Sequence, residues 1–264
     1  MTPSIGAVAA ILDNDQVISV PPAFVPEPAA GRVFAGRRLV RSTDVTVNGR
    51  LRLDALARYL QLVAEDDVAD AGLAEGVGWL VRRSEVTIRQ FPAAGERLSL
   101  RTFCSGTGPR WAERTTTLAG PDGDLVQARA VWAAVGPDGR PVTLSEAFLA
   151  IYGPATGGRI VSARLSHPRP ELSAGPTAGP EWPLRVADFD TAGHVNNAVY
   201  WQAVEDVLAA PDWPGWLPTV AEIEYHRPTL PGAVPRLLRG GRDRQSLLWL
   251  VDGSRLLASV RLAG

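Results

Sequence analysis

The chain has 264 residues, of which 45% are hydrophobic and 21% are charged, and its formal net charge at pH 7 is -1. This balance is typical of a globular protein with a buried core, and it argues against a nucleic-acid binder that relies on a general positive field. The single cysteine, Cys104, excludes an intrachain disulfide, and the three histidines are too far apart for a zinc motif.

The N-terminal segment, residues 1–36, is rich in Ala, Val and Pro and is interpreted as an extension outside the core. Its apolar stretch, Ile5–Leu12, ends at Asp13 and no basic region precedes it, so it is too short for a signal peptide or a membrane span. We therefore expect a cytoplasmic protein with no membrane insertion.

Two copies of one unit are indicated by matches of the chain to itself. An offset of 144 residues aligns these pairs: Arg41 with Arg185, Asp44 with Asp188, and Gly49 with Gly193. Offsets of 137 and then 130 align later pairs: Glu85 with Glu222, Gly95 with Gly232, and Asp122 with Asp252. Because the offset falls in steps of seven, the second copy has the same elements with shorter connections.

Each copy is predicted to contain a strand, a turn, a helix and then further strands. In the first copy a strand at Arg38–Val45 precedes a helix at Leu53–Ala71. Alternating apolar residues then predict strands near 79–91, 95–105, 110–118 and 124–135. In the second copy a strand at Leu184–Phe189 precedes a helix at Asn197–Ala210, with strands near 219–227, 233–240, 244–251 and 255–262.

The expected fold is α+β, with two tandem hotdog repeats, each an antiparallel sheet wrapped around a central helix. The second helix segment is apolar around much of its circumference, as a helix buried against a sheet should be. The repeats are predicted at 37–154 and 184–264, and residues 155–183, rich in Pro, Gly and Ser, form the linker.

The strongest functional signal is the stretch of residues that leads from the first predicted strand of the second copy into its helix. They are Asp190-Thr191-Ala192-Gly193-His194-Val195-Asn196-Asn197-Ala198-Val199-Tyr200. A tight Gly turn here places the Asp190 carboxylate and the His194 ring beside a helix N-terminus, where unpartnered N–H groups favour a developing oxyanion. Asp190 is predicted to act as general base or nucleophile, with His194 assisting. The residues predicted to position substrate or oxyanion are Gly193, Val195, Asn196 and Asn197.

This Asp-x-x-Gly-His-Val-Asn-Asn-x-x-Tyr motif resembles the signature of hotdog acyl thioesterases. Over both repeats, from about residue 38 to 264, the chain is most similar to acyl-ACP thioesterases, with weaker matches at 78–82, 91–96 and 222–225. The resemblance implies hydrolysis of fatty-acyl or related thioesters of acyl carrier protein or coenzyme A, without cofactor or metal. It also implies that Asp190 and His194 are catalytic. We expect the acyl chain to lie in a hydrophobic tunnel between the two repeats, lined from the first repeat.

Two positions depart from the plant-type acyl-ACP enzymes. Ala192 stands where those enzymes have Asn, and Pro228-Thr229 stands where they have a Glu-Cys pair. The remaining motif is similar to that of single-repeat acyl-CoA thioesterases, in which the Asp does most of the chemistry. In the repeat alignment Thr46 lies opposite Asp190 and Arg50 opposite His194, which predicts one active site per chain.

Several alternatives stay open at this stage. Asp190 and His194 can form a structural turn, or the protein can bind acyl thioesters without turning them over. A hotdog dehydratase or hydratase is disfavoured because its His–Asp or His–Glu pair has no match here. Both a monomer and a homodimer are compatible with two fused repeats.

Other polar residues have simpler expected roles. Four arginines near a predicted hairpin form either a solvated edge or a docking surface for a carrier protein or coenzyme A phosphates: Arg236, Arg239, Arg242 and Arg244. Cys104 is expected to be a small buried hydrophobe, and His226 to have a structural role at a strand end. His167 is expected to be a solvated linker residue.

Overall fold

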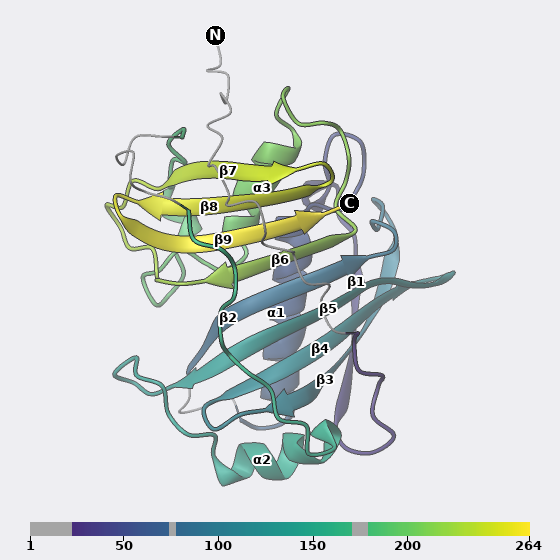
Figure 1. The fold of residues 1–264 in the computed structure, drawn as a ribbon. Coiled ribbons are helices and arrows are strands. Elements are labelled where there is room, and N and C mark those ends of the chain that lie inside the picture. Colours follow the sequence, from purple (N-terminus) through teal and green to yellow (C-terminus); the bar gives the residue numbers. More distant parts are fainter. Residues whose placement is uncertain (1–22, 74–77, 171–178) are drawn as a thin grey trace. The chain divides into compact units, whose positions relative to one another are not determined.

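The computed structural model describes residues 23–73, 78–170 and 179–264. The chain divides into two compact units, the first ending at Leu165 and the second beginning at Ser166. Each unit contains one antiparallel sheet and one central helix (Figure 1).

The sheet of the first unit has the strand order β1-β3-β4-β5-β2, and every neighbouring pair is antiparallel. Its strands are β1 (Val33–Leu39), β2 (Gly78–Ile88), β3 (Arg97–Thr107), β4 (Trp111–Gly120) and β5 (Gly123–Val135). β4 and β5 form a hairpin at the sequence Gly-Pro-Asp-Gly, residues 120–123, where Gly120 pairs with Gly123.

The helix of this unit is α1 (Leu53–Asp70), and it buries one face against the sheet. Apolar residues three or four positions apart, Leu53, Leu56, Tyr59 and Val63, are all at most 6% exposed. One turn further on, the buried Asp67 carboxylate accepts from Arg32 Nε at 2.6 Å and Arg114 Nη1 at 2.5 Å. Two guanidinium groups thus compensate a charge that burial alone would destabilise, and this explains how Asp67 can be buried in the last turn of α1.

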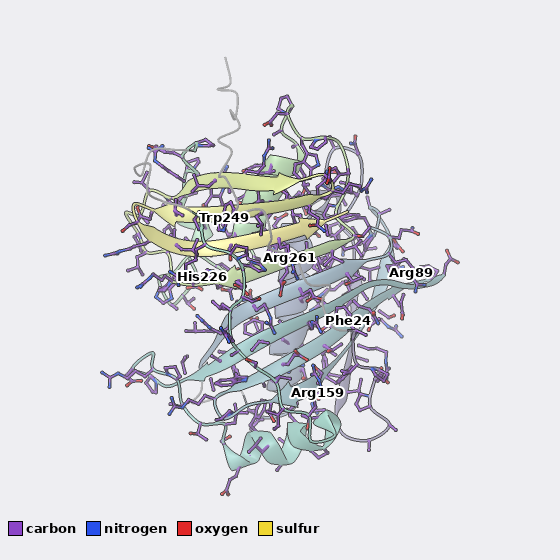
Figure 2. The ribbon with its side chains drawn as sticks, in the orientation of Figure 1. Phe24, Arg89, Arg159, His226, Trp249 and Arg261 are labelled. Atoms are coloured by element: carbon purple, nitrogen blue, oxygen red, sulfur yellow. The ribbon has the colours of Figure 1, made fainter. Side chains whose placement is uncertain are left out.

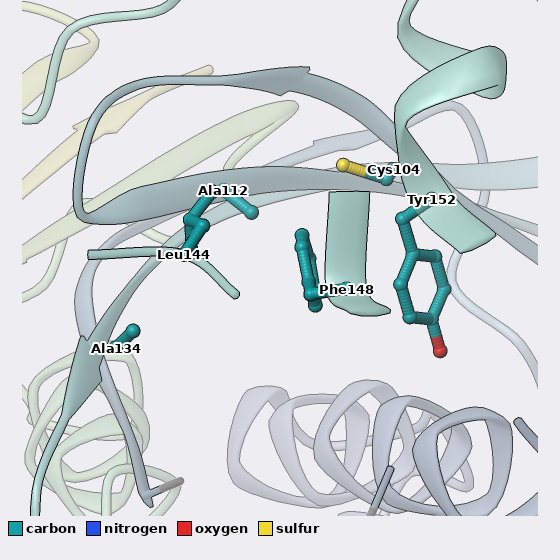
Figure 3. Packing of buried hydrophobic residues seen from close by; sticks show 6 residues of the cluster. All are labelled: Cys104, Ala112, Ala134, Leu144, Phe148 and Tyr152. Atoms are coloured by element: carbon teal, nitrogen blue, oxygen red, sulfur yellow. The ribbon is translucent and has the colours of Figure 1, made fainter. Parts of the chain in front are cut away.

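A second helix, α2 (Glu146–Tyr152), covers a separate apolar cluster of the first unit. Ser145 begins it, and its hydroxyl accepts from the Phe148 N–H at 3.1 Å. Cys104 lies in this cluster with Phe148 and Tyr152 (Figure 3). Cys104 is 2% exposed, so the prediction of a small buried hydrophobe is confirmed.

The sheet of the second unit has the order β6-β9-β8-β7, again antiparallel throughout. Its strands are β6 (Val220–Tyr225), β7 (Arg236–Arg242), β8 (Gln245–Asp252) and β9 (Arg255–Ala263), and the helix of this unit is α3 (Tyr200–Leu208). Five of the nine residues of α3 are buried, which is the wide apolar face of a helix enclosed by a sheet. The expected fold class, two hotdog repeats each built on a central helix, is confirmed.

Several predicted boundaries differ from the structure. The first strand begins at Val33 rather than Arg38. Leu184–Phe189 is not a strand but contains the 3₁₀ turn η3 (Val186–Asp188), because the Asp188 carboxylate accepts from the Arg185 N–H at 2.6 Å and bends the chain. The corresponding turn η1 (Ser42–Asp44) likewise replaces the end of the strand predicted at Arg38–Val45. α3 begins three residues later than predicted.

His167 corrects another expectation, since it is buried rather than solvated. Its Nδ1 lies 3.0 Å from Ser259 Oγ, and its Nε2 lies 3.2 Å from the buried Glu222 carboxylate. The next residue, Pro168, accepts from Trp249 Nε1 at 2.7 Å; Trp249 is marked on β8 in Figure 2. The linker residue is therefore held by polar groups of the second sheet that need partners once they are buried.

The segments before the two central helices share a set of main-chain hydrogen bonds. In the first unit, the N–H groups of Asp44, Thr46, Gly49, Leu51 and Arg52 donate to the carbonyls of Arg41, Arg50, Thr46, Pro92 and Asp44, in that order. In the second unit, the N–H groups of Asp188, Asp190, Gly193, Val195 and Asn196 donate to the equivalent carbonyls, those of Arg185, His194, Asp190, Thr229 and Asp188. All ten lie between 2.7 and 3.0 Å. The offsets of 144 and 137 found in the sequence therefore pair residues whose main-chain groups form equivalent hydrogen bonds.

None of the helices in the described part of the chain is long and apolar enough to cross a membrane. Within those same residues, no group of three or more His, Cys, Asp or Glu side chains has an arrangement that could hold a metal ion.

Candidate active site

Asp190 and His194 lie at the two ends of a tight turn. The Asp190 N–H donates to the His194 carbonyl at 2.8 Å, the Gly193 N–H donates to the Asp190 carbonyl at 3.0 Å, and Phe189 and Val195 form a β-bridge beyond them. Gly193 has φ +75°, a left-handed conformation that glycine adopts without strain. The Gly of the motif is therefore required by the backbone of the turn.

The Asp190 carboxylate is held by this same turn. Its Oδ1 accepts from the Ala192 N–H at 2.9 Å and the His194 N–H at 3.2 Å. The residue is exposed, and within the described chain no group hydrogen-bonds to Oδ2. Two main-chain donors thus orient the carboxylate through Oδ1 and leave Oδ2 without a partner among the described residues.

His194 is tied to Asp190 through its backbone rather than through its ring. Its N–H and carbonyl both bond to Asp190, whereas no side chain or main-chain group of the described residues hydrogen-bonds to the half-buried imidazole. The ring is therefore available to a substrate.

Three of the four predicted oxyanion donors are already engaged within the protein. The N–H groups of Gly193, Val195 and Asn196 donate to the carbonyls of Asp190, Thr229 and Asp188. Asn197 differs: its N–H has no acceptor among the described residues, and its carbonyl accepts from the Tyr225 hydroxyl at 3.0 Å.

Asn196 contributes its side chain instead. Its Oδ1 accepts from the Ala198 N–H at 2.9 Å and its carbonyl accepts from the Val199 N–H at 2.9 Å. These bonds shape the turn that leads into α3 and account for the late start of the helix.

Two residues with side-chain hydroxyl groups support the turn. Tyr200 begins α3 and its hydroxyl donates to Thr229 Oγ1 at 2.7 Å, while the Thr229 carbonyl accepts from the Val195 N–H at 3.0 Å. Sequence reasoning noted Thr229 only as the absence of a plant-type cysteine. The signal that could have singled it out is the repeat alignment, which sets a residue without a hydroxyl, Pro92, opposite it.

The four arginines named from the sequence lie on or near the β7–β8 hairpin, but they are not equivalent. Arg236 pairs with Glu181 at 2.5 Å, Arg239 pairs with Asp212 at 2.7 Å, and the Arg244 guanidinium lies 5.9 Å from the Trp216 ring centre. Arg242 pairs with Gln245 in the sheet, and its side chain lies outside the described atoms.

Cys104 belongs to the core of the first unit. Burial raises the pKa of its thiol to about 11, so the side chain is a neutral thiol near pH 7. Among the chain's candidate nucleophiles, the exposed Asp190 carboxylate is therefore the better placed.

A sheet around a central helix, formed twice, and an exposed aspartate turn ahead of the second helix are together the features of a hotdog thioesterase. The comparison with protein families is more specific. The N-terminal domain of acyl-ACP thioesterases matches residues 31–152, and the C-terminal domain of the same enzymes matches residues 177–238. The chain belongs to the acyl-ACP thioesterase family, and this makes it a thioester hydrolase.

Individual proteins and solved structures are also similar to the chain. An uncharacterized protein of Mycobacterium tuberculosis is 29% identical over 217 residues, which cover 80% of this chain and 83% of that protein. An acyl-ACP thioesterase from Bacteroides thetaiotaomicron has a TM-score of 0.73 at 17% identity, covering 88% of this chain and 97% of its own. A 12:0-ACP thioesterase from Umbellularia californica has a TM-score of 0.71 at 17% identity, covering 88% and 96%. At these identities the two structures show a shared fold.

Proposed function

We propose that this protein hydrolyses the thioester of a fatty-acyl or related group carried by acyl carrier protein, with coenzyme A thioesters as the alternative substrate. The observation that carries the proposal is the Asp190 carboxylate, fixed through Oδ1 by two main-chain N–H groups and open at Oδ2. The family match supports the carrier protein as the physiological donor. We further propose a cytoplasmic enzyme with one site per chain, as a monomer or a homodimer.

In the proposed reaction Asp190 acts as general base. Its carboxylate accepts a proton from water while the water oxygen attacks the thioester carbonyl carbon, and the C–S bond then breaks. The thiolate of the carrier takes the proton from the Asp190 carboxyl group, which regenerates the carboxylate, and the products are a free acid and a thiol. The Asn197 N–H is the donor that we assign to the developing oxyanion, because its three neighbours already donate to carbonyls.

Replacing Asp190 tests the proposal directly. Asp190→Asn should lower kcat by about 10³-fold, within the range that a general base contributes, and leave the melting curve close to wild type. His194→Ala should be milder, with a loss of about 10²-fold. The measurement is thiol release from acyl carrier protein and coenzyme A thioesters of matched chain length. An Asp190→Asn enzyme with near wild-type turnover would show that the site is elsewhere.

A labelling experiment separates base catalysis from nucleophilic attack. In rapidly quenched single turnovers of a thioester with a radiolabelled acyl group, direct attack by Asp190 would leave the label transiently on the protein as a mixed anhydride, whereas base catalysis places the label only in the released acid. If wild-type protein binds acyl thioesters tightly but releases no thiol from any of them, it is a binding protein rather than an enzyme.

A further inference from the structure

A buried pair of hydroxyl groups supports the turn that carries Asp190. The Tyr200 hydroxyl donates to Thr229 Oγ1 at 2.7 Å, and the two residues are 3% and 1% exposed. Thr229 is also bonded to the turn itself, because its carbonyl accepts from the Val195 N–H at 3.0 Å. A short path of hydrogen bonds therefore joins the first residue of α3 to the residue that follows His194.

The same turn folds in the first repeat without this pair. The offset of 144 places Leu56 opposite Tyr200, and the offset of 137 places Pro92 opposite Thr229. The Leu51 N–H nevertheless donates to the Pro92 carbonyl at 2.7 Å, as the Val195 N–H does to Thr229. The main-chain frame is thus common to both repeats, and the hydroxyl pair occurs in the repeat that contains Asp190 and His194. A feature that the fold does not require is a candidate for function.

Electrostatics connects the pair to Asp190. Burial raises the pKa of Tyr200; hydrogen bonds with Thr229 oppose this rise, and the negative charge of Asp190 adds to it. The phenol is therefore protonated at neutral pH and remains the donor in its bond to Thr229.

We propose that Tyr200 and Thr229 are positioning residues for catalysis by Asp190, an inference that rests on the proposed function. The Tyr200 O–H fixes the side chain of Thr229, and Thr229 holds the His194–Val195 end of the turn through its carbonyl. The turn then orients the Asp190 carboxylate through the His194 N–H. Because proton transfer depends steeply on placement, loosening this path should lower the rate of the chemical step more than substrate binding.

Substitutions that remove only a hydroxyl test the pair. Thr229→Val and Tyr200→Phe should each lower kcat about 10-fold and change KM by less than about twofold. The double variant should be no slower than the slower single one, because both changes break the same bond. Thr229→Ser, which keeps a hydroxyl at this position, should retain most of the wild-type rate.

The first repeat provides a matched control. Tyr59 there donates its hydroxyl to Asp44 Oδ2, also at 2.7 Å, beside the equivalent turn. Tyr59→Phe should lower the melting temperature about as much as Tyr200→Phe while kcat stays at the wild-type value. A loss of rate that merely reflects a loosened fold would appear in both variants.

Amide hydrogen exchange gives a readout that does not depend on turnover. Tyr200→Phe should speed exchange in a peptide covering 189–197 and leave 45–52 unchanged, and Tyr59→Phe should do the reverse. Wild-type kcat in Thr229→Val and Tyr200→Phe, or losses that multiply in the double variant, would overturn the positioning role. If wild-type protein is itself inactive, the proposed function fails, and unchanged exchange at 189–197 in Tyr200→Phe would then overturn the inference separately.

Discussion

At the scale of single residues, the two repeats offer internal controls that separate chemistry from folding. Asp190 and Thr46 occupy the same place in the same hydrogen-bonded turn, yet only one has a carboxylate. His194 and Arg50 likewise occupy the same place in the two turns, and only His194 has an imidazole. Comparing a substitution in one turn with its counterpart in the other therefore removes the common effect on the backbone.

Gly193 and Gly49 are the clearest pair of this kind. Their φ values are +75° and +81°, and a Cβ added at either would meet no atom within 4 Å. Gly193→Ala and Gly49→Ala should each cost about 1 kcal/mol of stability from left-handed backbone strain alone. Only Gly193→Ala should lower kcat, because it displaces the carboxylate of Asp190. Equal kcat values in the two variants, measured beside their melting temperatures, would contradict the assignment of the site.

At the scale of elements, the β7–β8 hairpin contains two kinds of arginine. Arg239 is 22% exposed at its side chain and forms an ion pair with Asp212, so it contributes to the packing of the unit. Replacing it by Glu would place two carboxylates together, and any loss of carrier binding would then be confounded with a loss of stability. Arg244 lies at the hairpin turn and is exposed.

Charge reversal at the turn is therefore the better test of carrier docking. Arg242→Glu combined with Arg244→Glu should raise KM for an acyl carrier protein about fivefold or more at low salt. The difference should shrink as salt screens exposed charges. A short neutral thioester provides the control, since its turnover should not change. If KM for the carrier responds to neither reversal nor salt, this hairpin is a solvated edge and docking occurs at another surface.

At the scale of the whole molecule, the duplication predicts one functional turn per chain. Thr46, at the position of Asp190, has a buried Oγ1 with no hydrogen-bond partner in the described structure. Thr46→Val removes that unsatisfied polar atom, so stability should be unchanged or slightly higher, and kcat should be retained. Active-site titration should give one site per chain in both proteins. Two sites per chain, or a Thr46→Val enzyme that loses most of its rate, would show that the first turn also takes part.

Local patterns in the sequence determined most of the architecture. Periodic apolar residues located α1 and the strands, because burial on one face leaves a regular signature. The falling offsets identified the duplication, since equivalent turns need the same Asp and Gly residues. The motif from Asp190 to Tyr200 located the candidate site for the same reason: Gly193 is required by the left-handed turn and Asp190 by its own main-chain hydrogen bonds.

Only the tertiary structure decided which groups are engaged. The sequence could not show that the N–H groups of Gly193, Val195 and Asn196 already have acceptors, because one of those acceptors, Thr229, lies 34 residues along the chain from Val195. It could not show that His167 is buried, since its partners come from β6 and β9. Hydrogen bonds between distant segments leave no periodic trace, so the sequence located the candidate turn while the fold determined which of its atoms have no partner within the protein.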